Sequence, residues 1–270
     1  MTDKANLSPY QGVPLVAQEA ELLELLEEMI GEPIPAGRIG FYTTGFKYAQ
    51  HHVIGLSLQN KGLESLPASI STLVNLEKLY LRDNRLITLP DTIGLLQNLK
   101  NLDVFNNRIT KLPKTIGRLD RLQRFDLSRN YIATLPESIG SLQALERLGL
   151  LNIQLEALPG SIGKLRNLWD LIASINHLES IPDSVGELTR LTRLVLHANK
   201  LRSLPETLGN LNNLELLSLH TNQLSVLPAT LARITTLQVL RLESNPLNPL
   251  SATHKRWITS LKSQGCGVRI

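Results

Sequence analysis

Residues 76–98 read LEKLYLRDNRLITLPDTIGLLQN, and residues 99–121 repeat the same pattern as LKNLDVFNNRITKLPKTIGRLDR. Units that fit the pattern LxxLxLxxNxLxxLPxxIGxLxx begin every 23 residues along most of the chain. Their first residues are Val53, Leu76, Leu99, Leu122, Leu145, Leu168, Leu191, Leu214 and Leu237, and the last unit is truncated. Residues 53–250 therefore form one array of nine repeats.

Each unit carries two signals for local structure. The stretch LxxLxL alternates apolar and polar residues, which predicts a short strand with one buried face. Leu89–Pro90 and Ile93–Gly94 predict a short helical turn that the proline opens and the glycine closes. One unit cannot cover its own leucines, so we expect the units to stack. Their parallel strands would lie about 4.8 Å apart on a concave face, with the helical turns on the outer face.

The asparagine that follows each strand is placed to support this stack, because its side chain can hydrogen-bond nearby backbone groups in a turn. The expected ladder comprises Asn84, Asn107, Asn130, Asn176, Asn199, Asn222 and Asn245. Ile153 interrupts it, since Asn152 comes one residue early, and Ala173 replaces a core leucine in the next unit. An unpaired backbone group at Ile153 would cost about 1–2 kcal/mol, unless a one-residue shift or a bound water supplies the missing bond.

These units resemble the leucine-rich repeat, and their LPxxIGxL form resembles that of the Ras-group leucine-rich repeat proteins. The resemblance implies an α/β solenoid shaped as a curved horseshoe, with parallel strands on its concave face and helical turns on its convex face. It also implies a cytosolic scaffold whose partners are small GTPases or phosphatase subunits. Bacterial effectors and receptor ectodomains contain similar repeats, but the single cysteine leaves no capping disulfides, which argues against a receptor.

The first 52 residues are expected to form a tail, an amphipathic helix and a cap. Residues 1–13 are polar, and we expect them to be loose. A helix is predicted over residues 14–30, whose apolar face either caps the first repeat or binds a partner. That face comprises Leu15, Leu22, Leu26, Met29 and Ile30, and the opposite face comprises Glu19, Glu21, Glu24, Glu27 and Glu28. Residues 34–52 are predicted to seal the open end as an irregular or hairpin segment. Their aromatic residues are Phe41, Tyr42, Phe46 and Tyr48.

Residues 251–270 are expected to form the C-terminal cap. Ser251 predicts a helix N-cap, and Gly265 predicts the residue just beyond the end of that helix. The apolar face of the helix comprises Trp257, Ile258 and Leu261, and Val268 with Ile270 predicts a last edge strand.

The composition limits the classes of function. The chain has 270 residues, a net charge of +4 and one cysteine. Its basic residues are spread along the repeats, which argues against nucleic-acid binding. The N-terminus shows no secretory signal, and no apolar run reaches the roughly 18 residues that a membrane span requires. We therefore expect a cytoplasmic protein that does not insert into membranes.

Motifs for catalysis are missing from the sequence. It contains no HExxH, CxxC or GxSxG and no glycine-rich phosphate loop, so we expect no enzymatic activity and no cofactor. Cys266 lies beside the C-terminal cap without the base that a catalytic cysteine needs. His197, His220 and Glu243 fall at one position of consecutive units and match zinc ligands by type. Arg241 is expected to pair with Glu243 instead, so we predict no tight metal site.

The variable strand positions predict a protein-binding concave face. Early units present charge there, and cross-strand pairs with arginines are expected to neutralise Asp103 and Asp126. Later units present apolar residues, among which Gly149 is expected to leave a pit, and Trp169, Ile172, Val195 and Leu216 are predicted to form one patch. The predicted contact residues are Phe105, Arg124, Arg147, Leu151, Trp169, Ile172, Ile175, Val195, His197, Leu216 and His220.

These features favour a non-enzymatic protein–protein interaction module or scaffold that binds a partner protein on its concave face and acts in signalling. The alternative is a bacterial effector-type leucine-rich repeat protein that recruits a host protein. An enzyme with a site on the concave face is the remote alternative.

Overall fold

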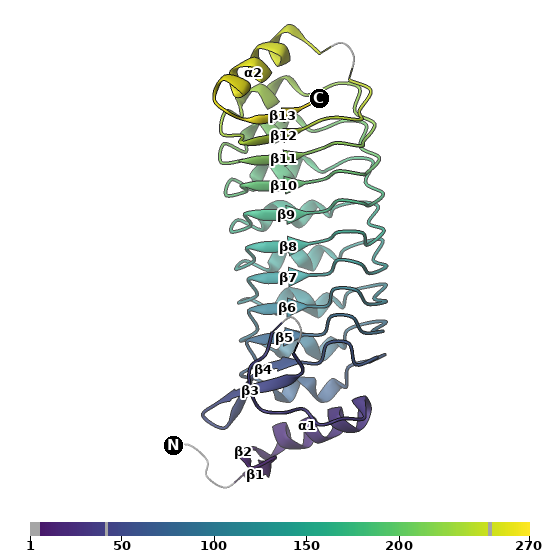
Figure 1. The fold of residues 1–270 in the computed structure, drawn as a ribbon, viewed down its shortest axis with the longest axis vertical. Coiled ribbons are helices and arrows are strands. Elements are labelled where there is room, and N and C mark those ends of the chain that lie inside the picture. Colours follow the sequence, from purple (N-terminus) through teal and green to yellow (C-terminus); the bar gives the residue numbers. More distant parts are fainter. Residues whose placement is uncertain (1–5, 41–42, 248–249) are drawn as a thin grey trace.

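The strands of the repeats form one sheet along the length of the molecule (Figure 1). The computed structural model describes residues 6–40, 43–247 and 250–270. The repeat strands pair in parallel and in register, as Leu79 and Leu102 do. They are β4 (His52–Ser57), β5 (Lys78–Tyr80), β6 (Asn101–Asp103), β7 (Arg124–Asp126), β8 (Arg147–Gly149), β9 (Asp170–Ile172), β10 (Arg193–Val195), β11 (Leu216–Ser218) and β12 (Val239–Arg241). The predicted strand of every unit is therefore confirmed.

A short 3-10 turn lies behind the sheet in each of the first eight units (Figure 1). The turns are η1 (Ala68–Thr72), η2 (Asp91–Leu95), η3 (Lys114–Arg118), η4 (Glu137–Ser141), η5 (Gly160–Lys164), η6 (Asp183–Glu187), η7 (Glu206–Asn210) and η8 (Ala229–Arg233). Each follows directly on a proline in extended conformation, such as Pro90 with φ −66° and ψ 150°. The prediction that the proline opens a helical turn is confirmed.

The predicted role of the repeat glycine is wrong. Gly94 lies inside η2, and the turn ends at Leu96, whose φ is −78°. A Cβ added at Gly94 would overlap the carbonyl oxygen of Thr115 and lie 2.8 Å from Thr115 Cβ. Thr115 belongs to η3, the turn of the next unit. Glycine is therefore required because adjacent turns approach too closely for a side chain, and not because a left-handed residue ends the helix.

The asparagine ladder is confirmed. Asn107 Nδ2 donates to Leu81 O at 2.9 Å and to Val104 O at 3.0 Å, and its Oδ1 accepts from Leu86 N at 3.0 Å. Each asparagine thus ties its own unit to the preceding one through backbone groups that the leucine core hides from water. The same three contacts recur at Asn84, Asn130, Asn199, Asn222 and Asn245, and Asn176 repeats the two bonds to the preceding unit.

The irregular unit keeps the register of its neighbours. Ile153 is fully buried in the core, while Asn152 is exposed with φ 53°. Ala173 is also fully buried. The one-residue shift that would restore the ladder at Ile153 does not occur, so Ile153 fills the asparagine position with apolar volume.

The N-terminal cap differs from the prediction in three respects. Leu7–Tyr10 (β1) and Val13–Val16 (β2) form an antiparallel hairpin, so residues 7–13 are not loose. The helix α1 (Ala17–Ile30) begins after the predicted start. Met29 is 39% exposed, whereas Glu19 is buried. Glu19 accepts hydrogen bonds from Val53 N at 2.6 Å and from the His52 ring at 2.8 Å, and burial raises the pKa of its carboxyl.

The predicted hairpin segment is confirmed in part. β3 (Gly45–Ala49) pairs antiparallel with β4, and Phe46 is fully buried against the first repeat. Tyr48 is 43% exposed, and Phe41 and Tyr42 lie outside the described residues.

The C-terminal cap follows the prediction closely. Ser251 Oγ accepts from His254 N at 3.1 Å at the start of α2 (Ala252–Ser263), and Trp257 Nε1 donates to Ile234 O at 2.8 Å. β13 (Gly267–Arg269) pairs parallel with β12, although Ile270 lies beyond it. In the described parts of the chain, neither helix combines the length and the apolar character that crossing a bilayer requires.

Candidate functional site

The concave face is built from three residues of each unit, because alternate residues of a strand point to the same side of a sheet. In the third repeat these residues are Asn101, Asp103 and Phe105. In-register pairing aligns equivalent residues in rows, so that Asp103 faces Asp126 on the next strand. Since the backbone of every repeat strand is hydrogen-bonded on both sides, this surface is a rigid platform.

A hollow of about 440 Å3 opens in this face where the sequence predicts a pit. Gly149 lies in the row of Asp126 and Ile172, and it contributes no side chain between them. A Cβ there would lie 2.6 Å from Asp126 Oδ1. We call this depression the Gly149 hollow. It is lined by Phe105, Arg124, Gly149, Leu151 and Ile172, together with the ion pairs described below.

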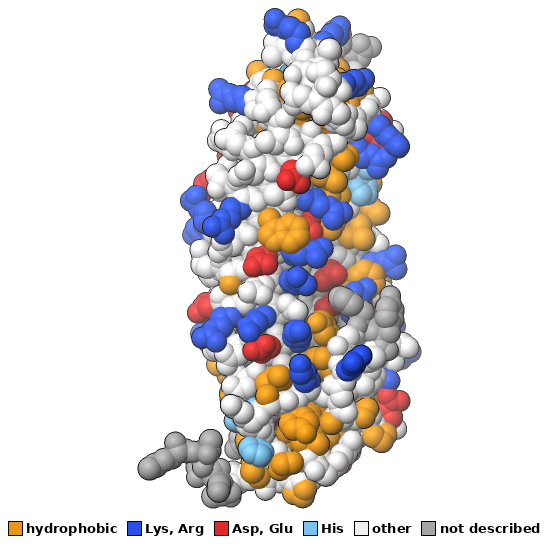
Figure 2. All heavy atoms as spheres, turned by 60° about the vertical axis from the view of Figure 1, so that its left-hand side comes forward, with side chains coloured by type: hydrophobic (Ala, Val, Ile, Leu, Met, Phe, Trp, Pro, Cys, Tyr) orange, Lys and Arg blue, Asp and Glu red, His pale blue; other side chains and the backbone are white. Residues whose placement is uncertain are grey.

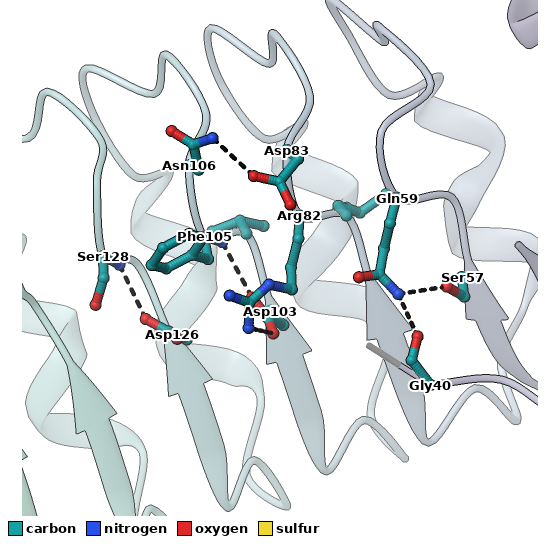
Figure 3. Close-up of polar contacts among 12 residues, drawn as sticks. Gly40, Ser57, Gln59, Arg82, Asp83, Asp103, Phe105, Asn106, Asp126 and Ser128 are labelled. Carbon is teal, nitrogen blue, oxygen red and sulfur yellow. Dashed lines mark hydrogen bonds and ion pairs between the residues drawn. The ribbon is translucent and has the colours of Figure 1, made fainter. Parts of the chain in front are cut away.

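The first ion pair lies at the edge of the Gly149 hollow (Figure 3). Arg82 donates to Asp103 Oδ2 at 3.2 Å, and Phe105 N donates to Asp103 Oδ1 at 3.0 Å. The predicted pairing with an arginine is therefore confirmed for Asp103. It is wrong for Asp126, which forms no ion pair among the described residues and accepts a hydrogen bond from Ser128 N at 3.0 Å. Burial, reinforced by the nearby carboxylate of Asp126, raises the pKa of Asp103 to about 6, because the two hydrogen bonds only partly compensate for the lost hydration.

Guanidinium groups also hold Phe105 in place. The Arg82 guanidinium lies 4.2 Å from the centre of the Phe105 ring, and that of Arg129 lies 5.3 Å from it. Contacts of this kind are attractive because the ring face is electron-rich. Phe105 is thus half-buried, with the guanidiniums of Arg82 and Arg129 over its ring.

The second ion pair was missed in the sequence. Asp170 is 2% exposed, and Arg147 donates to its Oδ2 at 3.2 Å. Arg193 Nε lies 3.8 Å from its other oxygen. The signal was present in the register, because Arg147, Asp170 and Arg193 occupy one row on consecutive strands.

A separate depression of about 550 Å3 lies nearer the C-terminus, and we call it the histidine hollow. It is lined by Val195, His197, Leu216, His220 and Arg241 among others. The two imidazole rings stack at 4.4 Å between centroids and 13° between planes. Burial lowers the pKa of His197, and the charges of His220 and Arg241 lower it further.

Glu243, the third residue of the suggested zinc set, does not join the two histidines. Glu243 pairs with Arg241 at 3.3 Å, as predicted. Within the described residues, no three potential metal ligands come close enough to hold an ion. Cys266 is buried, and burial raises the pKa of its thiol, which disfavours the reactive thiolate.

The predicted single apolar patch is not formed. Trp169 lies directly before β9, and its side chain lines a third hollow of about 640 Å3 together with Glu146 and Glu215. Arg147, which lines the Gly149 hollow, also contacts Trp169 in this third hollow, because its guanidinium lies 5.3 Å from the Trp169 ring. Val195 is only 6% exposed, so it offers little contact area.

Ile175 lies on the loop that follows β9 and is 47% exposed. Its φ of 56° is an unusual value for a β-branched residue. Other units place residues such as Asn106 and Asn152 at the same position and with the same sign of φ.

Comparison with known families agrees with this architecture. A model of a leucine-rich repeat region matches residues 147–263, a leucine-rich repeat model matches residues 97–155, and a model of two leucine-rich repeat copies matches residues 74–114. No curated protein matches the chain significantly.

Solved structures with the same fold include two plant receptors. The ectodomain of the membrane receptor kinase GASSHO1/SCHENGEN3 from Arabidopsis thaliana, in complex with Casparian strip integrity factor 2, is 31% identical over 76% of this chain and 26% of that chain, with a TM-score of 0.66. The plant peptide hormone receptor RGFR1, in complex with RGF2, is 27% identical over 67% of this chain and 34% of that chain, with a TM-score of 0.52. The chain thus spans about a third or less of these receptors.

The fold is that of a leucine-rich repeat solenoid. A leucine-rich repeat protein of Leptospira interrogans also matches, at 24% identity over 80% of this chain and 83% of that chain, but its TM-score of 0.42 is too low to support an argument. The matched families describe repeats of this general class, and they do not identify the Ras-group subtype that the LPxxIGxL pattern suggests.

The leucine-rich repeat solenoid presents its charge unevenly. Figure 2 shows one long face along which Lys and Arg side chains gather, with hydrophobic, Asp and Glu side chains between them. On the concave floor the acidic groups of the two ion pairs are nearly buried, with side-chain exposures of 8% for Asp103 and 2% for Asp170. Their arginine partners are more exposed, at 23% for Arg82 and 42% for Arg147. At these two ion pairs an approaching molecule therefore meets the guanidinium before the carboxylate.

Proposed function

We propose that this solenoid is a non-enzymatic protein-interaction module that binds a partner protein on its concave face and serves as a signalling scaffold. The observation that carries the proposal is the Gly149 hollow. It combines apolar walls with the exposed guanidinium of Arg124, which forms no ion pair among the residues that the structure describes. An apolar depression rimmed by polar groups on a rigid surface is typical of an interaction site.

The rigidity of the platform supports this assignment. A partner that binds to a preformed sheet loses its own freedom but does not have to order the receptor, so less of the contact energy is spent on ordering. The two plant receptors with the same fold are solved in complex with a partner, Casparian strip integrity factor 2 in one and RGF2 in the other. Small GTPases and phosphatase subunits, the partners that the LPxxIGxL pattern suggests, are the first candidates to test.

A pair of charge reversals tests the proposal. Arg124 lies on the concave face, and Arg118 lies on the opposite side of the solenoid in η3; both are exposed. Arg124→Glu is expected to remove capture of partner proteins from an extract of the native source, while Arg118→Glu is expected to retain it. Quantitative mass spectrometry of the captured proteins and a melting curve of each variant give the measurement. Equal capture by both variants, with both folded, would show that the concave face is not the binding site.

A further inference from the structure

We infer that the Gly149 hollow binds an extended, acidic segment of the partner, in which one apolar side chain enters the hollow and a neighbouring carboxylate meets Arg124. This inference rests on the proposed function and specifies the chemistry of the ligand at the same site. It follows from the shape of the hollow, from its charge and from the way in which the chain binds one of its own segments.

The shape indicates a side chain as the occupant. Gly149 contributes no side chain to the row between Asp126 and Ile172, and the Asp126 carboxylate reaches over it. Its walls are the apolar side chains of Phe105, Leu151 and Ile172. Its volume of about 440 Å3 lies at the small end of ligand-binding pockets. A depression of this volume accommodates protruding side chains of a partner.

The charge indicates an acidic occupant. Lys78 and Arg124 line the hollow, and neither forms an ion pair in the described portion of the chain. Arg82 and Arg147 are paired, but their acidic partners are nearly buried while the guanidiniums remain accessible. A carboxylate beside the hollow therefore meets cations at its rim, and bidentate pairing with a guanidinium also fixes its orientation.

The chain shows that polar side chains of this face bind the backbone carbonyls of another segment. Residues of the N-terminal cap lie across the first repeats, where Gln59 Nε2 donates to Gly40 O (Figure 3) and Ser57 Oγ donates to Thr43 O. Ser57 and Gln59 occupy the same positions in their repeat as Gly149 and Leu151 do four units later. The concave positions of the first repeat thus already hold two backbone carbonyls, those of Gly40 and Thr43, and the free face begins beyond them.

Nucleic acid is a weaker candidate for the anionic ligand. The floor of the hollow carries the carboxylates of Asp103 and Asp126, which repel a continuous row of phosphates. The aromatic ring nearest to it, Phe105, is flanked by Arg82 and Arg129 and is not a free stacking platform.

The test uses the intact chain as bait for a phage library that displays random twelve-residue peptides. Enriched peptides are synthesised with a fluorescent label, and their affinity is measured by anisotropy. We expect a consensus with Asp or Glu within two residues of Leu, Ile or Phe. Gly149→Leu, which fills the hollow, is expected to weaken binding at least tenfold, and Arg124→Gln by a similar factor. Gly160→Leu, at a glycine with open space around it in η5, is the matched control and is expected to bind normally.

Each other outcome has a defined meaning. Peptides without acidic residues, or peptides whose affinity ignores both Gly149→Leu and Arg124→Gln, would overturn the inference, as would displacement by a poly(dT) oligonucleotide at lower concentration than by the peptides. If Gly149→Leu fails to fold, Arg124→Gln and Ile172→Ala decide in its place. If no peptide is enriched while the capture of whole proteins still depends on Arg124, the inference is wrong and the proposed function stands. Loss of that dependence would reject the proposed function itself.

Discussion

Two glycines of one turn allow the packing of the convex side to be tested. Gly160 and Gly163 both belong to η5, and neither has a positive φ. A Cβ at Gly163 would overlap Ser184 O and lie 2.8 Å from Ser184 Cβ and 3.0 Å from its carbonyl carbon, whereas a Cβ at Gly160 would meet nothing within 4 Å. Most of the obstruction at Gly163 is backbone of the next unit, which cannot move aside as the end of a side chain can.

The expected magnitudes are well separated. Forcing a methyl group into packed backbone costs about 1–3 kcal/mol, so Gly163→Ala should lower the free energy of unfolding by that amount. Gly160→Ala should leave it unchanged or raise it by about 0.4–1 kcal/mol, because alanine restricts the unfolded chain. In a domain of this size each kcal/mol shifts the melting temperature by roughly 2–4 °C.

Calorimetry and urea unfolding of the two variants, side by side with the parent chain, give the measurement. The reasoning would be refuted if Gly163→Ala were as stable as Gly160→Ala. That result would mean that adjacent turns separate freely, and the glycine column would then need another explanation.

Two further predictions concern pH. The pKa of Asp103 is about 6 in the folded chain, above its ordinary value of 3.8, so the folded state binds the proton first and stability from this group rises as pH falls from 7 to 4. Two pKa units correspond to about 3 kcal/mol. The free energy of unfolding at pH 5 minus that at pH 7.5 should therefore be lower in Asp103→Asn than in the parent. The pKa of His197 is lowered, so the unfolded state takes the proton first and stability from this group is lost as pH falls below about 6.5. NMR titration should show that His197 takes up its proton below that value, and that its pKa rises in His220→Gln. An unchanged pKa would contradict a role for the stacked ring.

The repeat array was predictable because its leucine spacing states the contacts directly. A period of 23 residues places each leucine against its equivalent in the next unit, and the asparagine ladder follows from the same alignment. The role of Gly94 was not predictable in this way. Its cause is a backbone approach to Thr115, which depends on how tightly two turns stack, whereas the sequence shows only a glycine near the end of a helical pattern.

For the candidate site, the sequence predicts which residues lie side by side on neighbouring strands. Register brought His197 against His220 and left a pit at Gly149, as expected. Trp169 was misplaced because it lies just before the strand, where the alternation of strand side chains does not apply. The N-terminal hairpin was missed because Leu7–Tyr10 and Val13–Val16 are short and contain prolines, which argue against strands.

The distance between neighbouring strands determines how the residues of a segment that lies across the sheet are placed over them. Strands follow one another at about 4.8 Å, while an extended chain advances about 3.3 Å per residue. Six residues of such a segment therefore cover about 20 Å, nearly the same distance as four strands. Ser57, beneath the segment that the chain supplies itself, and Gly149 stand four units apart at one position of the repeat. Since alternate side chains of an extended segment point to the same side, those that face the sheet return to the same position relative to a strand about every sixth residue.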